Sequence, residues 1–161
     1  MLRRAGLVAL LVMALVIAAT ALASATGRDS DGRKVEVINL DTRSNQGADL
    51  DLGDEGLSVG DRFAFSEKAF RDGRYAGKLG GECVIVIADK DDESATTDCV
   101  VTLALRDGQI TTQGLVEFAE ETEPFTIAVT GGTGDYRTAR GEVQVTEEGD
   151  EGSHIVITLL R

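Results

Sequence analysis

Two acidic residues, Glu36 and Glu67, stand in runs where apolar and polar residues alternate. Glu36 shares its parity with Ile38 and Leu40, and Glu67 follows Phe65 by two positions. If these runs are β-strands, both carboxyl groups point to the apolar side of the sheet or lie at its rim. A carboxyl group in apolar surroundings has a raised pKa and can act as an acid or a base near neutral pH. On this pattern alone a surface or rim position is favoured for Glu36, and an inward carboxyl group that acts as acid or base is the alternative.

The two cysteines, Cys83 and Cys99, are equidistant from Asp91, the middle of an acidic turn. In a symmetric antiparallel hairpin they would face each other directly, where side chains approach closely. A disulfide needs Cβ atoms about 3.8 Å apart, and that pairing nearly supplies this distance. We therefore predict a Cys83–Cys99 disulfide.

Other chemistries lack the residues that they need. The only histidine, His154, precedes an apolar run and is expected at the surface, so a Ser-His-Asp hydrolase and a His/Cys metal site are poorly supplied. No acidic loop has the ligand spacing of a dedicated calcium site. The glycines of residues 131–134 are followed by no Lys-Ser/Thr pair or helical pattern, which favours a turn over a phosphate loop. We predict no metal and no cofactor.

The elements that would position these residues are strands. Runs of β-branched residues alternate with Gly- and Asp-rich turns, and Asp72-Gly73 and Asp107-Gly108 are strong hairpin signals. This pattern predicts an all-β fold, an eight-stranded antiparallel up-and-down β-barrel of lipocalin size, because closure removes exposed edges. A sandwich is the competing architecture. The predicted strands are residues 34–41, 60–69, 74–88, 96–106, 109–119, 124–131, 139–147 and 153–160, and residues 42–58 are expected to form one long mobile connection.

Alternation along these strands predicts an apolar interior. If Cys83 points inward, Ile85 and Ile87 do so as well. A barrel of eight strands is just wide enough to fill itself or to hold one small ligand. The predicted ligand pocket consists of Phe63, Phe65, Glu67, Ile85, Val116 and Phe125.

The first 25 residues have the pattern of a secretion signal. Arg3 and Arg4 precede an uncharged apolar stretch, and small residues before Ala23 and Ala25 suit cleavage after either. A retained membrane anchor is the alternative, since the stretch nearly reaches the ~20 residues that spanning requires. Cleavage would change the formal charge from −12 to −14, because two arginines are lost. We expect a secreted, extracellular, acidic protein that binds neither nucleic acid nor, once cleaved, membrane. The domains are predicted as signal peptide 1–25, flexible leader 26–33 and barrel domain 34–161.

Four segments together resemble the allene oxide cyclase and dirigent protein superfamily. The most specific is the glycine-rich sequence TGGTGDYRTARGEV of residues 130–143, and GDRFAF (60–65), AGKLGGEC (76–83) and QITTQG (109–114) occur in the same order as in that superfamily. The resemblance implies an eight-stranded barrel, often a homotrimer, that binds apolar small molecules. Glu36 and Cys83 align with a pocket glutamate and cysteine of the plant cyclases, and this resemblance makes Glu36 the candidate catalytic residue. Two other pocket positions differ, because a family tyrosine is Val116 here and an asparagine is Glu67.

The sequence therefore predicts a secreted small barrel that binds or shapes a small apolar molecule as a cyclase-like or dirigent-like factor. If it is an enzyme, the resemblance implies an isomerase or cyclase activity. The alternative is a non-catalytic extracellular structural or binding module whose barrel is filled by its own side chains.

Overall fold

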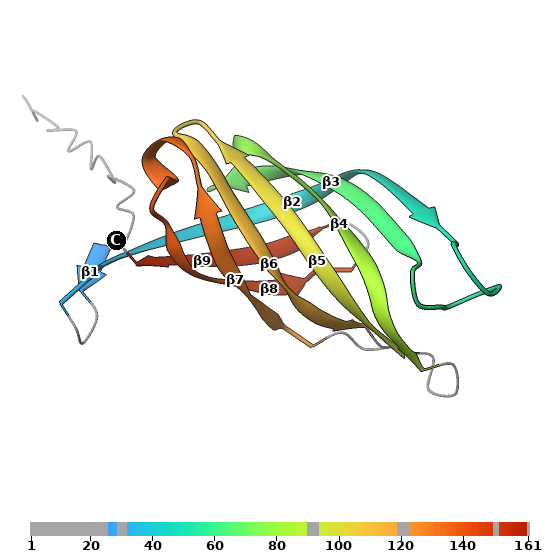
Figure 1. Ribbon diagram of the computed structural model, residues 1–161. Helices are drawn as coiled ribbons and strands as arrows, with labels where there is room; N and C mark the ends of the chain where they lie inside the picture. Colours follow the sequence, from blue (N-terminus) through green and yellow to red (C-terminus); the bar gives the residue numbers. More distant parts are fainter. Residues whose placement is uncertain (1–25, 29–31, 90–93, 119–122, 150–151, 161) are drawn as a thin grey trace, which may run out of the picture.

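The computed structural model describes residues 26–28, 32–89, 94–118, 123–149 and 152–160 (Figure 1). The predicted signal segment, residues 1–25, lies outside the described part of the chain. Within that part, no helix is long and apolar enough to cross a membrane.

The fold is an antiparallel β-barrel, as the sequence predicts. Each strand pairs with the next along the chain, and β2 also pairs with β9, which closes the sheet on itself (Figure 1). Eight strands, β2 to β9, form the barrel, and most begin and end within two residues of their predicted limits. The strands are β1 (Thr26–Arg28), β2 (Lys34–Leu50), β3 (Arg62–Arg71), β4 (Arg74–Asp89), β5 (Ser94–Leu105), β6 (Gly108–Phe118), β7 (Phe125–Gly132), β8 (Arg140–Glu147) and β9 (Ser153–Leu160).

The long mobile connection predicted for residues 42–58 is wrong in its first half. Strand β2 continues to Leu50, and its last residues pair with β3 in a register that places Asp49 opposite Phe63. A β-bulge at Asn45 interrupts this ladder, and the Asn45 side chain donates a hydrogen bond to Ser66 Oγ (3.2 Å). The polar, glycine-containing segment is a strand because β3 satisfies its backbone groups. Ahead of β2, residues 26–28 of the predicted leader form β1 and pair with residues 34–36.

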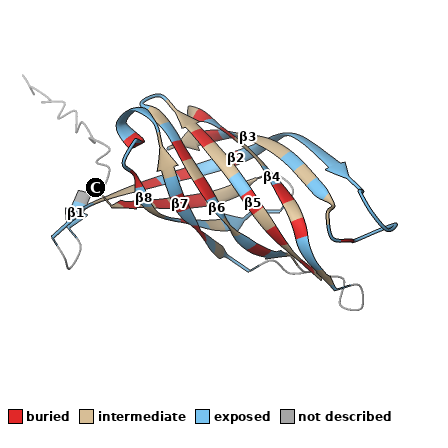
Figure 2. Cartoon of the chain, in the orientation of Figure 1, coloured by how far each residue is buried: buried red, intermediate tan, exposed pale blue. Residues whose placement is uncertain are grey.

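Apolar side chains on the inner face of the strands form one core (Figure 2). Burial is most complete where β2 meets β9, because Ile38, Leu40, Ile157 and Leu159 are each at most 1% exposed. One predicted inward residue is misplaced. A bulge between Ile85 and Ile87 on β4 reverses the alternation, so Ile87 is 59% exposed while Ile85 is buried.

The glycine-rich segment closes one end of the barrel. After β7 the chain forms the short 3-10 helix η1 (Gly134–Tyr136), and Tyr136 and Ala139 are buried there. A Cβ atom on Gly132 would lie 2.6 Å from Tyr136 O, so only glycine allows η1 to fold back onto β7. The glycines thus have a structural role.

Cys83 and Cys99 form the predicted disulfide. They are direct cross-strand partners on β4 and β5, with Cα atoms 4.1 Å apart, and both are buried. The bond joins two adjacent strands of the barrel wall, and its sequence separation is 16 residues.

Replacing both cysteines by alanine should lower the free energy of unfolding by about 3 kcal/mol, because the unfolded chain regains the entropy of a loop of this size. Urea denaturation followed by far-UV circular dichroism measures the change. A loss below about 1 kcal/mol would contradict a stabilising role for this bond.

Candidate functional site

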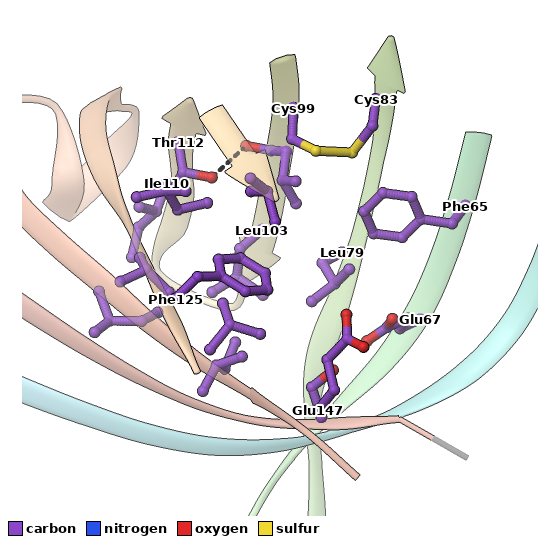
Figure 3. A pocket seen from close by; sticks show the side chains of 18 of the residues that line it. Phe65, Glu67, Leu79, Cys83, Cys99, Leu103, Ile110, Thr112, Phe125 and Glu147 are labelled. Atoms are coloured by element: carbon purple, nitrogen blue, oxygen red, sulfur yellow. Dashed lines mark hydrogen bonds between the residues drawn. A yellow bond between two sulfur atoms is a disulfide. The ribbon is translucent and has the colours of Figure 1, made fainter. Parts of the chain in front are cut away.

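The barrel is not filled by its own side chains. A cavity of about 220 Å³, here called the inner pocket, lies on the inner side of strands β3 to β9 (Figure 3). Its volume is below the roughly 300–1,000 Å³ of pockets for drug-sized molecules, which suits a small, compact ligand. The lining is mostly aliphatic and aromatic: Phe63, Phe65, Glu67, Leu79, Cys83, Cys99, Val101, Leu103, Ile110, Thr112, Val116, Phe118, Phe125, Ile127, Val143, Val145, Glu147, Ser153, Ile155 and Ile157.

Two carboxyl groups interrupt this apolar lining. Glu67 on β3 and Glu147 at the end of β8 point toward each other at one edge of the inner pocket (Figure 3). Glu67 has the inward parity of Phe63 and Phe65, and Glu147 has that of Val145. The Glu67 residue is half-buried, whereas Glu147 lies at the rim, where part of it contacts solvent.

The strands that lie between Glu67 and Glu147 in the barrel wall determine how closely the two carboxyl groups approach each other. Along the barrel wall, β2 and β9 separate β3 from β8. Thr42 on β2 is buried, accepts a hydrogen bond from Ser153 N–H (2.9 Å) and donates one to Ser153 O (3.1 Å). This double contact holds β9 against β2 beside Glu147, whose cross-strand partner is Ser153. The geometry of the carboxyl pair therefore depends on a fixed part of the wall.

The environment changes the acidity of Glu147. Burial desolvates the carboxylate and raises the pKa of Glu147, and the negative charge of Glu67 raises this pKa further. Glu147 therefore keeps its proton to a higher pH than an ordinary glutamate does. It can donate that proton to a ligand in the inner pocket.

Aromatic rings form the side of the inner pocket near this edge. Phe63 and Phe65 lie with ring centroids 6.2 Å apart, and Phe63 meets Phe118 edge to face at 5.6 Å. The disulfide also lines the cavity beside these rings, because Cys83 is the cross-strand partner of Phe63. Thr112 donates its hydroxyl proton to Val101 O (3.4 Å), as the dashed line in Figure 3 shows. Such walls suit a flat, apolar ring.

A second cavity of about 280 Å³, here called the outer chamber, adjoins the inner pocket. The two cavities share Phe63 and Phe118. The rest of the outer chamber comes from the β2–β3 hairpin, its connecting loop, and strands β4 and β5. Its remaining lining residues are Asp49, Leu50, Asp51, Gly56, Leu57, Asp61, Arg62, Ile85, Ala95 and Thr97.

The residues that the sequence assigns to the pocket are not all in one place. Five of them, Phe63, Phe65, Glu67, Val116 and Phe125, line the inner pocket, whereas Ile85 lines the outer chamber.

Glu36, the predicted catalytic residue, lines neither cavity. It is half-buried and pairs with Leu159 on β9, six residues from Ser153 and thus roughly 20 Å along the strand from the carboxyl pair. Glu36 therefore lies too far from Glu67 and Glu147 to act together with them.

Glu147 is the charged lining residue of the inner pocket that sequence reasoning missed. It stands at the start of an acidic run, Glu147-Glu148, which resembles a solvent-exposed turn. Glu147 follows Val143 and Val145 by even numbers of residues on the same strand. Strand alternation could therefore have placed its side chain inside the barrel. For metals, no group of three or more His, Cys, Asp or Glu side chains is arranged to hold an ion within the described ranges.

Comparisons with known proteins place this architecture. The family described as "Allene oxide cyclase barrel like domain" matches residues 37–159. Among solved structures, a pyocyanin demethylase is 32% identical, with a TM-score of 0.68 over 76% of this chain and 98% of its own.

Two further solved structures share the fold at lower identity. The exo-specific intermolecular Diels-Alderase AbnU is 17% identical (TM-score 0.63; 79% of this chain, 98% of that one). The pterocarpan synthase dirigent protein PsPTS1 is 18% identical (TM-score 0.63; 80% and 96%). A search of curated proteins finds no match. With its barrel matched over residues 37–159, the chain belongs to the family of allene oxide cyclase barrel-like domains.

Proposed function

We propose that the protein binds a small, flat, apolar ring compound in the inner pocket and isomerises it by proton transfer through Glu67 and Glu147. The observation that carries this proposal is the pair of carboxyl groups facing each other in an otherwise apolar cavity. Two titratable groups with different environments are a common arrangement for acid and base roles.

The two carboxyl groups have different parts in this reaction. Glu147, whose pKa is raised by burial and by Glu67, donates its proton to an oxygen or nitrogen atom of the ligand. Glu67 removes a proton from an activated C–H position of the same molecule. The ligand then has the same composition as before, with one hydrogen atom and one double bond in new positions, and the two carboxyl groups exchange a proton to restore their starting state.

The relatives support the choice of ligand class. The 32% identical protein is named for an activity on pyocyanin, a tricyclic aromatic compound, and the more distant structures are named as a cyclase, Diels-Alderases and dirigent proteins. The phenylalanines of the inner pocket suit rings of this kind. The alternative of a barrel filled by its own side chains receives no support from a cavity of about 220 Å³.

We also propose that the protein is exported and acts as a homotrimer outside the cell. The Cys83–Cys99 disulfide supports an oxidising compartment. Val86, Val100 and Leu115 are exposed on the adjacent strands β4, β5 and β6 and supply an apolar outer surface for contact between copies.

Loss of either carboxyl group should abolish proton transfer. 2-Tetralone, a bicyclic ketone small enough for the inner pocket, can report the chemistry through exchange of its α-hydrogens with D₂O, followed by NMR. We expect the wild-type protein to accelerate the exchange, and Glu67→Gln and Glu147→Gln each to reduce the acceleration by about a hundredfold. Glu142→Gln, on the outer face of the same strand as Glu147, is the matched control. Wild-type acceleration in both inner variants, or none in the wild type, would contradict the proposal.

Ionised Glu147 should destabilise the fold. Because its pKa is raised in the folded state, the folded protein binds more protons than the unfolded chain does between the ordinary and the raised pKa. Glu147→Gln should thus become more stable relative to wild type as pH rises from 4 to 8, with the gain developing between the ordinary and the raised pKa and constant above the latter. Urea denaturation across this range measures the difference, again with Glu142→Gln as control. A stability difference independent of pH would show that burial does not shift this group.

A further inference from the structure

The outer chamber, with a volume of about 280 Å³, has no role in the proton transfer proposed above. We propose that it is a second ligand site, for an organic cation with an aromatic or alkyl body, held between Asp49 and the rings of Phe63 and Phe118.

The floor of the outer chamber is aromatic. Phe63 and Phe118 meet edge to face, with centroids 5.6 Å apart and planes at 85°, and both contribute to the two cavities. The pair forms the partition between a ligand in the inner pocket and one in the outer chamber. Aromatic faces attract organic cations that approach within about 6 Å of the ring centroid.

Asp49 supplies the charge beside this floor. It is the direct cross-strand partner of Phe63, so the two side chains lie on the same face of the β2–β3 hairpin. Asp49 is exposed, and among the residues that the structure describes none forms a hydrogen bond or ion pair with its carboxylate. Its charge is available to a ligand.

The remaining charged groups keep the outer chamber negative. Asp51 and Asp61 are acidic, and among the lining residues that the structure describes only Arg62 is basic. The Arg62 guanidinium lies 4.0 Å from Glu82, and both side chains are about half exposed. With three aspartates against one arginine, the chamber favours a cation and opposes an anion, such as a fatty-acid carboxylate.

The loop between β2 and β3, which forms one wall of the outer chamber, is held in place by hydrogen bonds within the protein itself. The Asp61 carboxylate accepts hydrogen bonds from Leu52 N–H and Ser58 N–H, both at 2.8 Å, and from the Ser58 hydroxyl at 3.1 Å. Gly60 N–H donates to Ile85 O, and Ile85 N–H donates to Asp61 O, both at 2.9 Å. The loop is therefore fixed to β4, which lowers the entropy cost of binding.

The contribution of the Asp49 charge to cation binding can be measured in a protein whose inner carboxyl groups have been replaced by neutral amides. In a Glu67→Gln/Glu147→Gln protein, equilibrium dialysis compares N-methylphenazinium, a cation, with neutral phenazine. We expect the cation to bind more tightly by roughly fivefold. Asp49→Asn should remove this preference, whereas Glu117→Gln, which makes the same charge change on the outer face of β6, should keep it. Since the inner carboxyl groups are absent, the result does not depend on the proposed proton transfer.

The position of the cation is tested with two leucines of one loop. Leu57 lines the outer chamber, whereas Leu52 does not. Because both side chains are exposed, neither alanine substitution should disturb the packing of the hydrophobic core. We expect Leu57→Ala to weaken N-methylphenazinium binding about threefold through lost apolar contact, and Leu52→Ala to bind as its parent does. Circular dichroism melting confirms folding. An unchanged cation preference in Asp49→Asn, or equal affinities in the two leucine variants, would overturn the proposal.

Discussion

The pairing of β2 with β9 is the constraint on which the rest of the structure depends. It joins the first barrel strand to the last through residues 35–41 and 154–160, and so removes both edges of the sheet. Once the sheet is closed, strand alternation directs every second side chain into a confined interior. Several of the most completely buried side chains lie along this seam, including Ile38, Leu40 and Leu159. Hydrophobic burial and closure therefore stabilise each other.

The interior is filled at one end and hollow toward the other. At the filled end, Tyr136 and Ala139 of the glycine-rich segment are buried, and neither lines a cavity. Toward the other end, phenylalanines are half-buried around two cavities that share Phe63 and Phe118. The seam also ends there, at the Thr42–Ser153 contact beside Glu147. The same closure that stabilises the fold thus places the partly buried Glu147 carboxyl group at the edge of an apolar pocket.

Strand alternation and turn residues were sufficient to predict the barrel, most strand limits and the Cys83–Cys99 pair, because these depend on local pattern and symmetry. Three features were missed for identifiable reasons. Residues 42–50 are polar and become a strand only through pairing with β3. The bulge at Val86 reverses the inward and outward alternation along β4, so the alternation rule wrongly predicts that Ile87 points inward. Glu147 adjoins an acidic turn, and its place in the pocket follows from tertiary packing against Glu67.

Glu67 and Glu147 share the edge of an apolar pocket, and the effect of this arrangement on the pKa of Glu147 is directly measurable. The side-chain carboxyl carbon of Glu147 can be titrated by ¹³C NMR in the wild-type protein and in Glu67→Gln. We expect the wild-type pKa of Glu147 to lie above that of an ordinary glutamate and to fall part of the way back in Glu67→Gln, since desolvation remains when the neighbouring charge is removed. An ordinary pKa for Glu147, the same in both proteins, would contradict the account.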